Sequence, residues 1–190
     1  MTGKGPIAIK TPITLKTLRR LRTGDCVSIT GVVYTARDAA HQRMWQAAQQ
    51  GKALPFEPKG QILFYVGPTP APPGRVIGSA GPTTASRMDL FTPMLIERGL
   101  RGMIGKGRRS RPVLEAALGQ GCVYFGAVEG TAALLAECIL FAEVVAYEDL
   151  GTEAIHRLKV ENFPAIVVND LFGGDLYDEG QKRYRRLWPT

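Results

Sequence analysis

The sequence has few cysteines, and their spacing narrows the class of protein. Cys26, Cys122 and Cys138 are the three cysteines among 190 residues, and they lie far apart. Such spacing fits neither a paired disulfide framework nor the closely spaced ligands of a metal or iron–sulfur site. We therefore expect buried, apolar thiols and no cluster bound by this chain alone.

Long apolar runs are also lacking. The longest, at residues 62–66 and 132–146, are too short or too interrupted by glutamates to cross a bilayer. The first ten residues lack the apolar core of a secretory signal. No repeat or low-complexity segment is present. These absences predict a cytoplasmic protein with no membrane partner.

The composition is that of an ordinary globular domain with a basic excess. Hydrophobic residues make up 45% and charged residues 22% of the chain, so we expect one folded domain over residues 1–190. The formal charge is +7, and basic residues cluster at 16–22, 101–111 and 182–186. Such an excess suits nucleic acid, an acidic partner chain or a small anionic substrate. No nucleic-acid-binding motif accompanies the clusters, so we expect no nucleic acid partner.

Apolar alternation gives way repeatedly to helical periodicity, which predicts a mixed α/β fold. Alternation between turn residues predicts strands at Cys26–Tyr34, Ile62–Val66, Gly102–Ile104, Cys122–Val128, Val144–Tyr147, Ile155–Val160 and Ala165–Val168. Helix formers bounded by capping residues predict helices at Leu15–Leu21, Ala36–Gln50, Met88–Arg98, Arg111–Leu118 and Thr131–Ile139. The order of these elements indicates a layered α/β domain with a mixed sheet.

Residues 81–89 combine a Gly-Pro turn, three hydroxyl residues and Arg87 just before a predicted helix. Free N–H groups at a helix start attract anions, and an arginine can bind a carboxylate through two parallel hydrogen bonds. The segment therefore predicts an anion site. A simpler interpretation is that Thr83 or Thr84 only caps the helix, with Asp89 supporting its first turn.

Two further junctions also offer cations. Residues 105–110 place Lys106 between two glycines, which lets the backbone approach a ligand, but Gly107 after the lysine excludes a nucleotide P-loop. Residues 34–41 form a strand-to-helix junction with Arg37, Asp38 and His41. Taken alone, Arg37 and Asp38 are typical of a solvated charge pair, and His41 of an exposed helical residue. Parallel strands gather such junctions at one edge, so together they indicate a site.

These segments together resemble the β subunit, or C-terminal domain, of class I fumarases and L-tartrate dehydratases. The matching stretches, which span nearly the whole chain, are Tyr34–His41, Gly78–Thr84, Arg87–Asp89, Gly102–Gly107, Gly130–Ala133 and Phe163–Ala165. The resemblance implies a swivelling β/β/α domain. It also implies a larger α subunit whose three cysteines hold a [4Fe–4S] cluster, and hence a hetero-oligomer. The open iron would be the Lewis acid for the substrate hydroxyl.

The resemblance also implies roles for individual residues. Thr83 would be the general base that exchanges the C3 proton of the substrate, while Arg37, Arg87 and Lys106 would hold its two carboxylates. Thr84 and His41 are carried over as further substrate-binding candidates, and Asp38 is expected to orient Arg37. A threonine hydroxyl is a poor base in water, so this role requires neighbouring cations that lower its pKa.

We therefore expect a hydro-lyase that interconverts fumarate and L-malate at an interface with the α subunit. One alternative is an L-tartrate dehydratase β subunit, because tartrate differs by one extra hydroxyl. Another is a noncatalytic basic module for binding or assembly. These three functions predict different ligands, and the sequence alone leaves them open.

Overall fold

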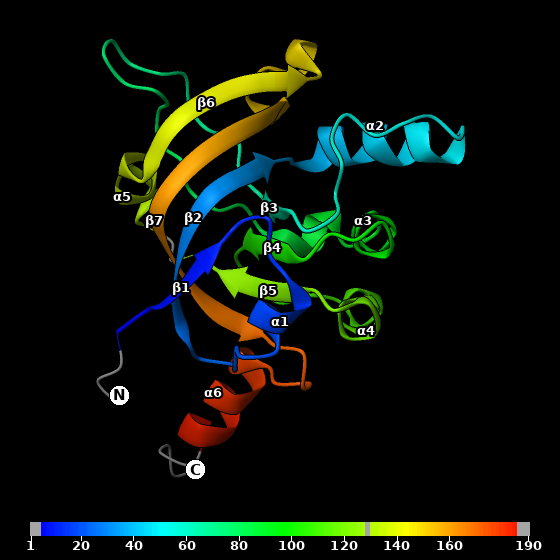
Figure 1. Cartoon of the computed structure of the whole chain (residues 1–190), viewed down its shortest axis with the longest axis vertical. Helices are drawn as coiled ribbons and strands as arrows, with labels where there is room; N and C mark the ends of the chain where they lie inside the picture. Colours follow the sequence, from blue (N-terminus) through cyan, green and yellow to red (C-terminus); the bar gives the residue numbers. More distant parts are fainter. Residues whose placement is uncertain (1–4, 128–129, 186–190) are drawn as a thin grey trace.

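Five strands close into a barrel, and two more extend it (Figure 1). The computed structural model describes residues 5–127 and 130–185. Its strands are β1 (Ile7–Lys10), β2 (Cys26–Thr35), β3 (Ile62–Phe64), β4 (Gly102–Gly105), β5 (Val123–Gly126), β6 (Ile139–Ala146) and β7 (Ile155–Asn169). Strands β2, β3, β4 and β5 are successive parallel neighbours, and β7 runs antiparallel to both β5 and β2. This pairing closes the ring and confirms the predicted mixed sheet.

Helices α2, α3 and α4 stand together on one side of the barrel (Figure 1). The helices are α1 (Leu15–Leu18), α2 (Asp38–Gln49), α3 (Thr92–Glu97), α4 (Arg111–Gln120), α5 (Ala132–Glu137) and α6 (Leu176–Tyr184), with short 3-10 segments η1 (Ala85–Met88) and η2 (Glu148–Glu153). Among the described residues, no helix has the length and apolar character needed to cross a membrane. The layered α/β architecture predicted from the sequence is confirmed.

The central strands are apolar on both faces because both faces are buried. Ile62 and Phe64 point into the barrel with side chains from every other barrel strand, and the Phe64 ring meets Phe163 edge-on at 5.3 Å. The alternate residues, Leu63 and Tyr65, belong to a second core beneath α2, α3 and α4. Alternation with period two thus builds two cores from one strand.

One predicted helix is wrong. Within residues 88–98, only Thr92–Glu97 form a helix, α3, while Met88 is the last residue of η1. Pro93 lies in the first turn of α3, where proline is favoured, and it would have disrupted the interior of a longer helix. The hydroxyl of Thr92 donates to the Met88 carbonyl at 2.8 Å, which helps to hold the two elements together across the break.

Several predicted strands and helices also have different boundaries in the structure. The segments predicted at residues 155–160 and 165–168 form one strand, β7, in which Asn162 has a φ of 52° near a register shift. Strand β6 starts at Ile139 rather than Val144, and α1 is a single turn. The first strand, β1, was not predicted. Val128, the last residue of a predicted strand, and Arg186 of the basic cluster at 182–186 lie outside the described residues.

A buried carboxylate fastens the end of β7 to the turn before β2. Asp170 Oδ2 accepts the backbone N–H of Thr23 at 3.0 Å, and Oδ1 accepts those of Phe172 at 2.8 Å and Gly174 at 3.0 Å. Burial by itself would raise the pKa of Asp170, but these hydrogen bonds to the ionised form lower it overall. The carboxylate therefore stabilises the fold when it is ionised.

We expect the Asp170→Asn variant to lose about 1–3 kcal/mol of unfolding free energy near neutral pH, because the amide nitrogen would face N–H donors. The folded-state pKa of Asp170 is lowered from 3.8, so this contribution is present above that pH and disappears as the pH falls below it. Urea unfolding of the wild type and the variant, from neutral pH to below pH 3.8, measures this difference in unfolding free energy. A difference that stays constant with pH would contradict the proposed ionic contribution.

Candidate active site

Two arginines from distant segments share one carboxylate. Arg37 is the last residue before α2, and Asp38 is in the first turn of that helix. Asp38 Oδ1 lies 2.8 Å from Arg87 Nε, and Asp38 Oδ2 lies 3.7 Å from Arg37 Nε. Asp38 therefore lies between both arginines and brings the start of α2 next to η1. The sequence predicted its contact with Arg37 but not the shorter one with Arg87.

A second carboxylate holds Arg37 from η2. Glu153 Oε1 lies 3.5 Å from the Arg37 guanidinium, and Glu153 Oε2 accepts the backbone N–H of Ala39 at 3.0 Å. On another side, a Cβ atom at Gly67 would come within 2.7 Å of Arg37 Nη1. The Arg37 side chain therefore packs directly against the backbone at Gly67, and 22% of its surface remains exposed. It is fixed in place but can still reach a ligand.

The predicted base and the predicted lysine are joined through their backbones. Thr83 N–H donates to the Tyr65 carbonyl at 2.8 Å, and Lys106 N–H donates to the Thr83 carbonyl at 3.2 Å. Ala85 N–H in turn donates to the Lys106 carbonyl at 2.8 Å, and Thr84 and Lys106 form a parallel bridge. This short strand-like segment lies beside the ends of β3 and β4. Thr83 is partly exposed, and Thr84 is exposed.

The predicted anion site cannot rest on a helix dipole. The element that follows Thr84 is η1, a single 3-10 turn, and the Thr84 side chain makes no capping hydrogen bond. A one-turn element has little macrodipole, because the effect requires several aligned peptide units. The interpretation of Thr84 as a helix cap is therefore wrong. Any attraction for an anion at this place would therefore have to come from the cations rather than from a helix start.

An open cleft lies beside this segment. Its volume is about 490 Å³. Polar groups of Thr84 and Lys106 line it at one place, and mostly apolar side chains line the rest, including Ile166, Val168 and Leu176. A small ligand or a loop of a partner chain fits a cleft of this size.

His41 is fully buried, so the expectation of an exposed helical residue is wrong. The side of helix α2 that carries His41 packs against the rest of the domain. The centre of the His41 ring lies 5.5 Å from that of Tyr65 and 6.5 Å from that of Phe91. His41 Nδ1 lies 2.8 Å from the Arg37 carbonyl, as expected for a donating N–H. Burial lowers the pKa of His41 from its ordinary 6.5 to about 4, despite the hydrogen bond to Arg37. The ring is therefore neutral at physiological pH, and its hydrogen bond to the Arg37 carbonyl holds the backbone of that arginine in place.

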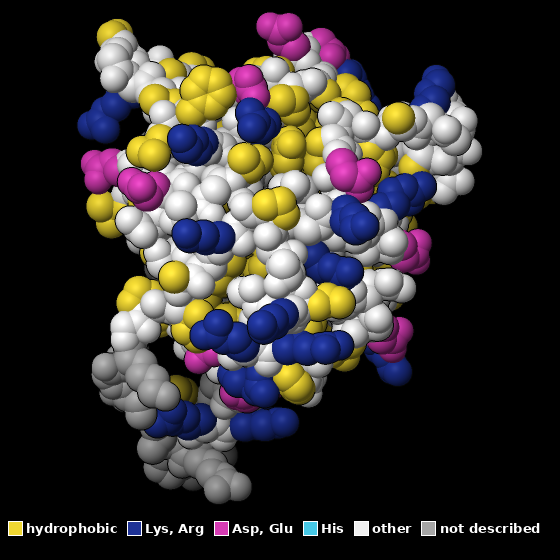
Figure 2. Space-filling model, in the orientation of Figure 1, with side chains coloured by type: hydrophobic (Ala, Val, Ile, Leu, Met, Phe, Trp, Pro, Cys, Tyr) yellow, Lys and Arg dark blue, Asp and Glu magenta, His cyan; other side chains and the backbone are white. Residues whose placement is uncertain are grey.

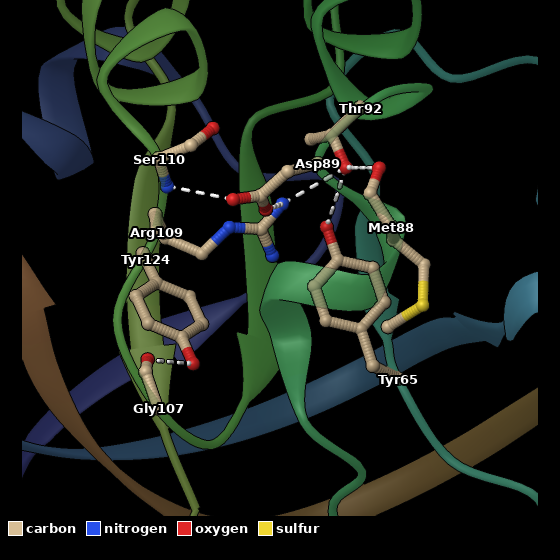
Figure 3. A network of polar contacts seen from close by, with 8 residues as sticks. All are labelled: Tyr65, Met88, Asp89, Thr92, Gly107, Arg109, Ser110 and Tyr124. Atoms are coloured by element: carbon tan, nitrogen blue, oxygen red, sulfur yellow. Dashed lines mark hydrogen bonds and ion pairs between the residues drawn. The ribbon is translucent and has the colours of Figure 1, made fainter.

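The sequence analysis missed a buried charge network next to these residues. The Arg109 side chain has no exposed surface, and its Nη2 lies 2.8 Å from Asp89 Oδ1. Figure 3 shows this pair with Tyr65 and Tyr124 on either side and Thr92 above. In sequence, Arg109 is one of a run of basic residues that look alike. Only its spacing from Lys106 could have attracted attention.

The described residues do not fit an iron–sulfur cluster. Cluster ligands are thiolates. The expectation of buried thiols is right only for Cys122, whose thiol pKa is raised by burial to about 12, and wrong for Cys26, which is exposed, and Cys138, which is partly exposed. Across residues 5–127 and 130–185, no three His, Cys, Asp or Glu side chains are grouped so that they could hold a metal ion.

Comparison with known proteins identifies the family of this chain. The family model for the fumarase C-terminus matches residues 2–180. The chain belongs to this family. The family resemblance inferred from the sequence is therefore confirmed, and the fumarase C-terminal domain is part of a hydro-lyase family.

Relatives of the chain differ in length. The chain is 40% identical, over 88% of its length, to fumarate hydratase 1, mitochondrial, of Leishmania major. It is also 40% identical, over 80% of its length, to the anaerobic class I fumarate hydratase of Escherichia coli K12. The chain spans only 31% and 28% of these proteins. It is 34% identical to a Methanocaldococcus jannaschii protein with the provisional name L(+)-tartrate dehydratase subunit beta, covering 92% of this chain and 93% of that one.

The neutral state of His41 gives the fumarase C-terminal domain a specific pH dependence. Between its ordinary pKa of 6.5 and its folded value of about 4, the unfolded chain binds a proton that the folded chain excludes. Stability should therefore fall as the pH drops through this window, by on the order of 2 kcal/mol at pH 5. The His41→Asn variant retains a donor for the Arg37 carbonyl and should lose this dependence.

Chemical unfolding of both proteins between about pH 7 and pH 5 measures the effect. Burial also lowers the pKa of His156, but that residue remains in both proteins and its contribution cancels in the comparison. Parallel pH profiles for the wild type and His41→Asn would show that His41 is not the source.

Proposed function

We propose that this chain is the β subunit of a hydro-lyase that converts fumarate and water to L-malate and back, with an α chain that carries a [4Fe–4S] cluster. One observation supports this most. Contacts at 2.8–3.7 Å join Arg37, Asp38 and Arg87, and backbone hydrogen bonds at 2.8–3.2 Å join the adjoining segment at Thr83 to Lys106. Three segments that resembled the family in sequence therefore meet in space.

The charges of these residues suit a dianion. Arg37, Arg87 and Lys106 bring three positive charges, which Asp38 and Glu153 partly offset. Asp38 engages Arg87 at Nε, so the two terminal nitrogens of that guanidinium remain to bind a substrate carboxylate by two parallel hydrogen bonds. Arg87 is 49% exposed and can therefore be reached by substrate. In this proposal the cations hold the two carboxylates, and Thr84 adds a hydroxyl beside them.

Thr83 is the proposed general base. In the direction from malate to fumarate, its deprotonated oxygen would take a proton from C3, and in hydration its hydroxyl would return that proton. A threonine oxygen reaches this state only if nearby positive charge stabilises the alkoxide. Lys106, hydrogen-bonded through the backbone to Thr83, lies in the adjoining segment. The described part of this chain offers no cluster ligands, so we derive from it only substrate binding and proton transfer.

His41 has a supporting role in this proposal. Its ring is buried and contacts the Arg37 carbonyl, so it fixes the start of α2 rather than contacting the substrate. Asp38 similarly orients Arg87 and Arg37. Both residues act on the arginines that bind the carboxylates.

A tartrate dehydratase β subunit is the second candidate. The Methanocaldococcus jannaschii relative bears this name provisionally and matches the present chain along nearly its whole length, whereas the fumarate hydratases are about three times longer. Assays of the complex on fumarate, malate and both tartrate enantiomers distinguish the two. Higher kcat/KM for L-tartrate than for malate would replace the first proposal with the second.

A noncatalytic basic module is the third candidate. Lys16, Arg19, Arg20 and Arg22 are exposed on and after α1, and Figure 2 shows many basic side chains toward that end of the molecule. Binding of nucleic acid through such charges would weaken steeply with salt. A dicarboxylate site instead predicts a thermal shift with malate or fumarate. Electrophoretic mobility and thermal shift assays therefore separate these functions.

We expect Thr83→Ala and Arg87→Ala to lower the turnover of the complex by roughly a hundredfold or more, because one removes the base and the other a carboxylate ligand. Both variants should still bind the α chain, which size-exclusion chromatography checks. Arg98→Ala is the matched control for Arg87→Ala, since Arg98 is also an exposed arginine and lies outside the predicted anion site. Near-normal turnover of the Thr83 variant would contradict its role as base.

A further inference from the structure

The Arg109 guanidinium is buried to an unusual degree. Its side chain has no exposed surface, and its central carbon lies 4.9 Å from the centre of the Tyr65 ring and 5.4 Å from that of Tyr124. Removing a charge from water costs several kcal/mol unless partners compensate for it. The two aromatic faces provide part of this compensation through cation–π attraction.

One carboxylate supplies the opposite charge. Asp89 Oδ1 lies 2.8 Å from Arg109 Nη2, which also donates to the Thr92 hydroxyl at 2.9 Å. Asp89 Oδ2 accepts the backbone N–H of Ser110 at 2.6 Å. Figure 3 shows that these groups come from two different segments, the loop after β4 and the connection between η1 and α3. The ion pair therefore fastens one segment to the other.

The two fastened segments are those that carry proposed substrate cations. Asp89 lies two residues after Arg87, and Arg109 lies three residues after Lys106. On the other side of these cations, Ala85 N–H donates to the Lys106 carbonyl at 2.8 Å. The segment that carries Arg87 is thus linked to the segment that carries Lys106 at two places, at Ala85 before Arg87 and at Asp89 after it. The separation of their backbones therefore depends on these links.

Tyr124 connects the same network to the residue after Lys106. Its hydroxyl donates to the Gly107 carbonyl at 3.0 Å, and Gly107 N–H donates to the Tyr177 hydroxyl at 3.0 Å. Gly107 has a φ of 82°, a conformation that suits glycine and lets the chain turn directly after the lysine. The backbone at Lys106 is therefore held from both directions.

The network is not arranged for stability alone. Within the described residues, Arg109 Nε and Nη1 are buried without a hydrogen-bond partner, and the contact at Asp89 Oδ1 is close but poorly aligned as a hydrogen bond. Replacing a buried ion pair by apolar residues is often neutral or stabilising. An apolar pair would fill this position equally well, but it would not fix the geometry of the loop through directional contacts.

We propose that the Arg109–Asp89 ion pair is a positioning device that sets the separation of Arg87 and Lys106, and so selects dicarboxylates of one chain length. This inference rests on the proposed function, in which these two cations hold the substrate carboxylates. Arg109 touches no substrate. It acts through the two segments that it joins.

The test uses the complex with the α chain and the Arg109→Met variant, which removes the charge at similar volume. KM for malate should rise about tenfold or more, with a smaller change in kcat, because binding geometry is lost before the chemistry. Inhibition by the inert dicarboxylates succinate and glutarate, which differ by one methylene, gives a second readout. One of the two should inhibit the wild type more strongly than the other, and the ratio of their inhibition constants should move toward one in the variant. Arg109→Lys should recover part of both losses.

Leu18→Ala is the matched control, since Leu18 is buried in the barrel core in α1, outside this network. It should lower the melting temperature but leave KM and the inhibitor preference unchanged. If Arg109→Met does not fold, Asp89→Asn breaks the same pair at unchanged shape. Unaltered KM and preference in a folded variant of an active complex overturn this inference alone. If the wild-type complex neither binds nor converts any dicarboxylate, the proposed function fails with it.

Discussion

The antiparallel pairing of β7 with both β5 and β2 closes the barrel, and the candidate site depends on that closure. Strands β2 to β5 run parallel, so their carboxyl ends meet at one edge. Arg37 follows β2, Gly67 follows β3 and Lys106 follows β4. A closed ring fixes the order and tilt of its strands, and residues remote in sequence therefore come to one place.

Around that edge, carboxylates of the chain hold the cations in a fixed arrangement. Asp38 and Glu153 orient Arg37 and Arg87 at the surface, while Asp89 pairs with the buried Arg109 beneath. Exposed ion pairs contribute little to stability because water screens them. Their effect here is geometric: Asp38 meets Arg87 at Nε, and Arg37 is contacted by Asp38 at Nε and by Glu153 at Nη2. In our proposal, such an arrangement is organised for an anion before the anion binds.

The relatives bear on our proposal that another chain completes the site. The fumarate hydratases that resemble this chain are about three times its length, and the chain corresponds to less than a third of each. The described residues bring cations and a threonine together but no metal ligands. In our proposal, the remaining part of the reaction belongs to another chain, as the name "subunit beta" of one relative suggests.

The sequence by itself determined the central strands, the mixed class and the family, because alternation of apolar residues and short motifs are local properties. It also placed Arg37, Thr83, Arg87 and Lys106 at junctions, since glycine, proline and hydroxyl residues mark chain turns locally. The burial of His41 was decided only by the packing of α2 against the barrel. The ion pair of Arg109 with Asp89 likewise required two segments to meet, and charge in a sequence does not say which side chains will share a buried environment.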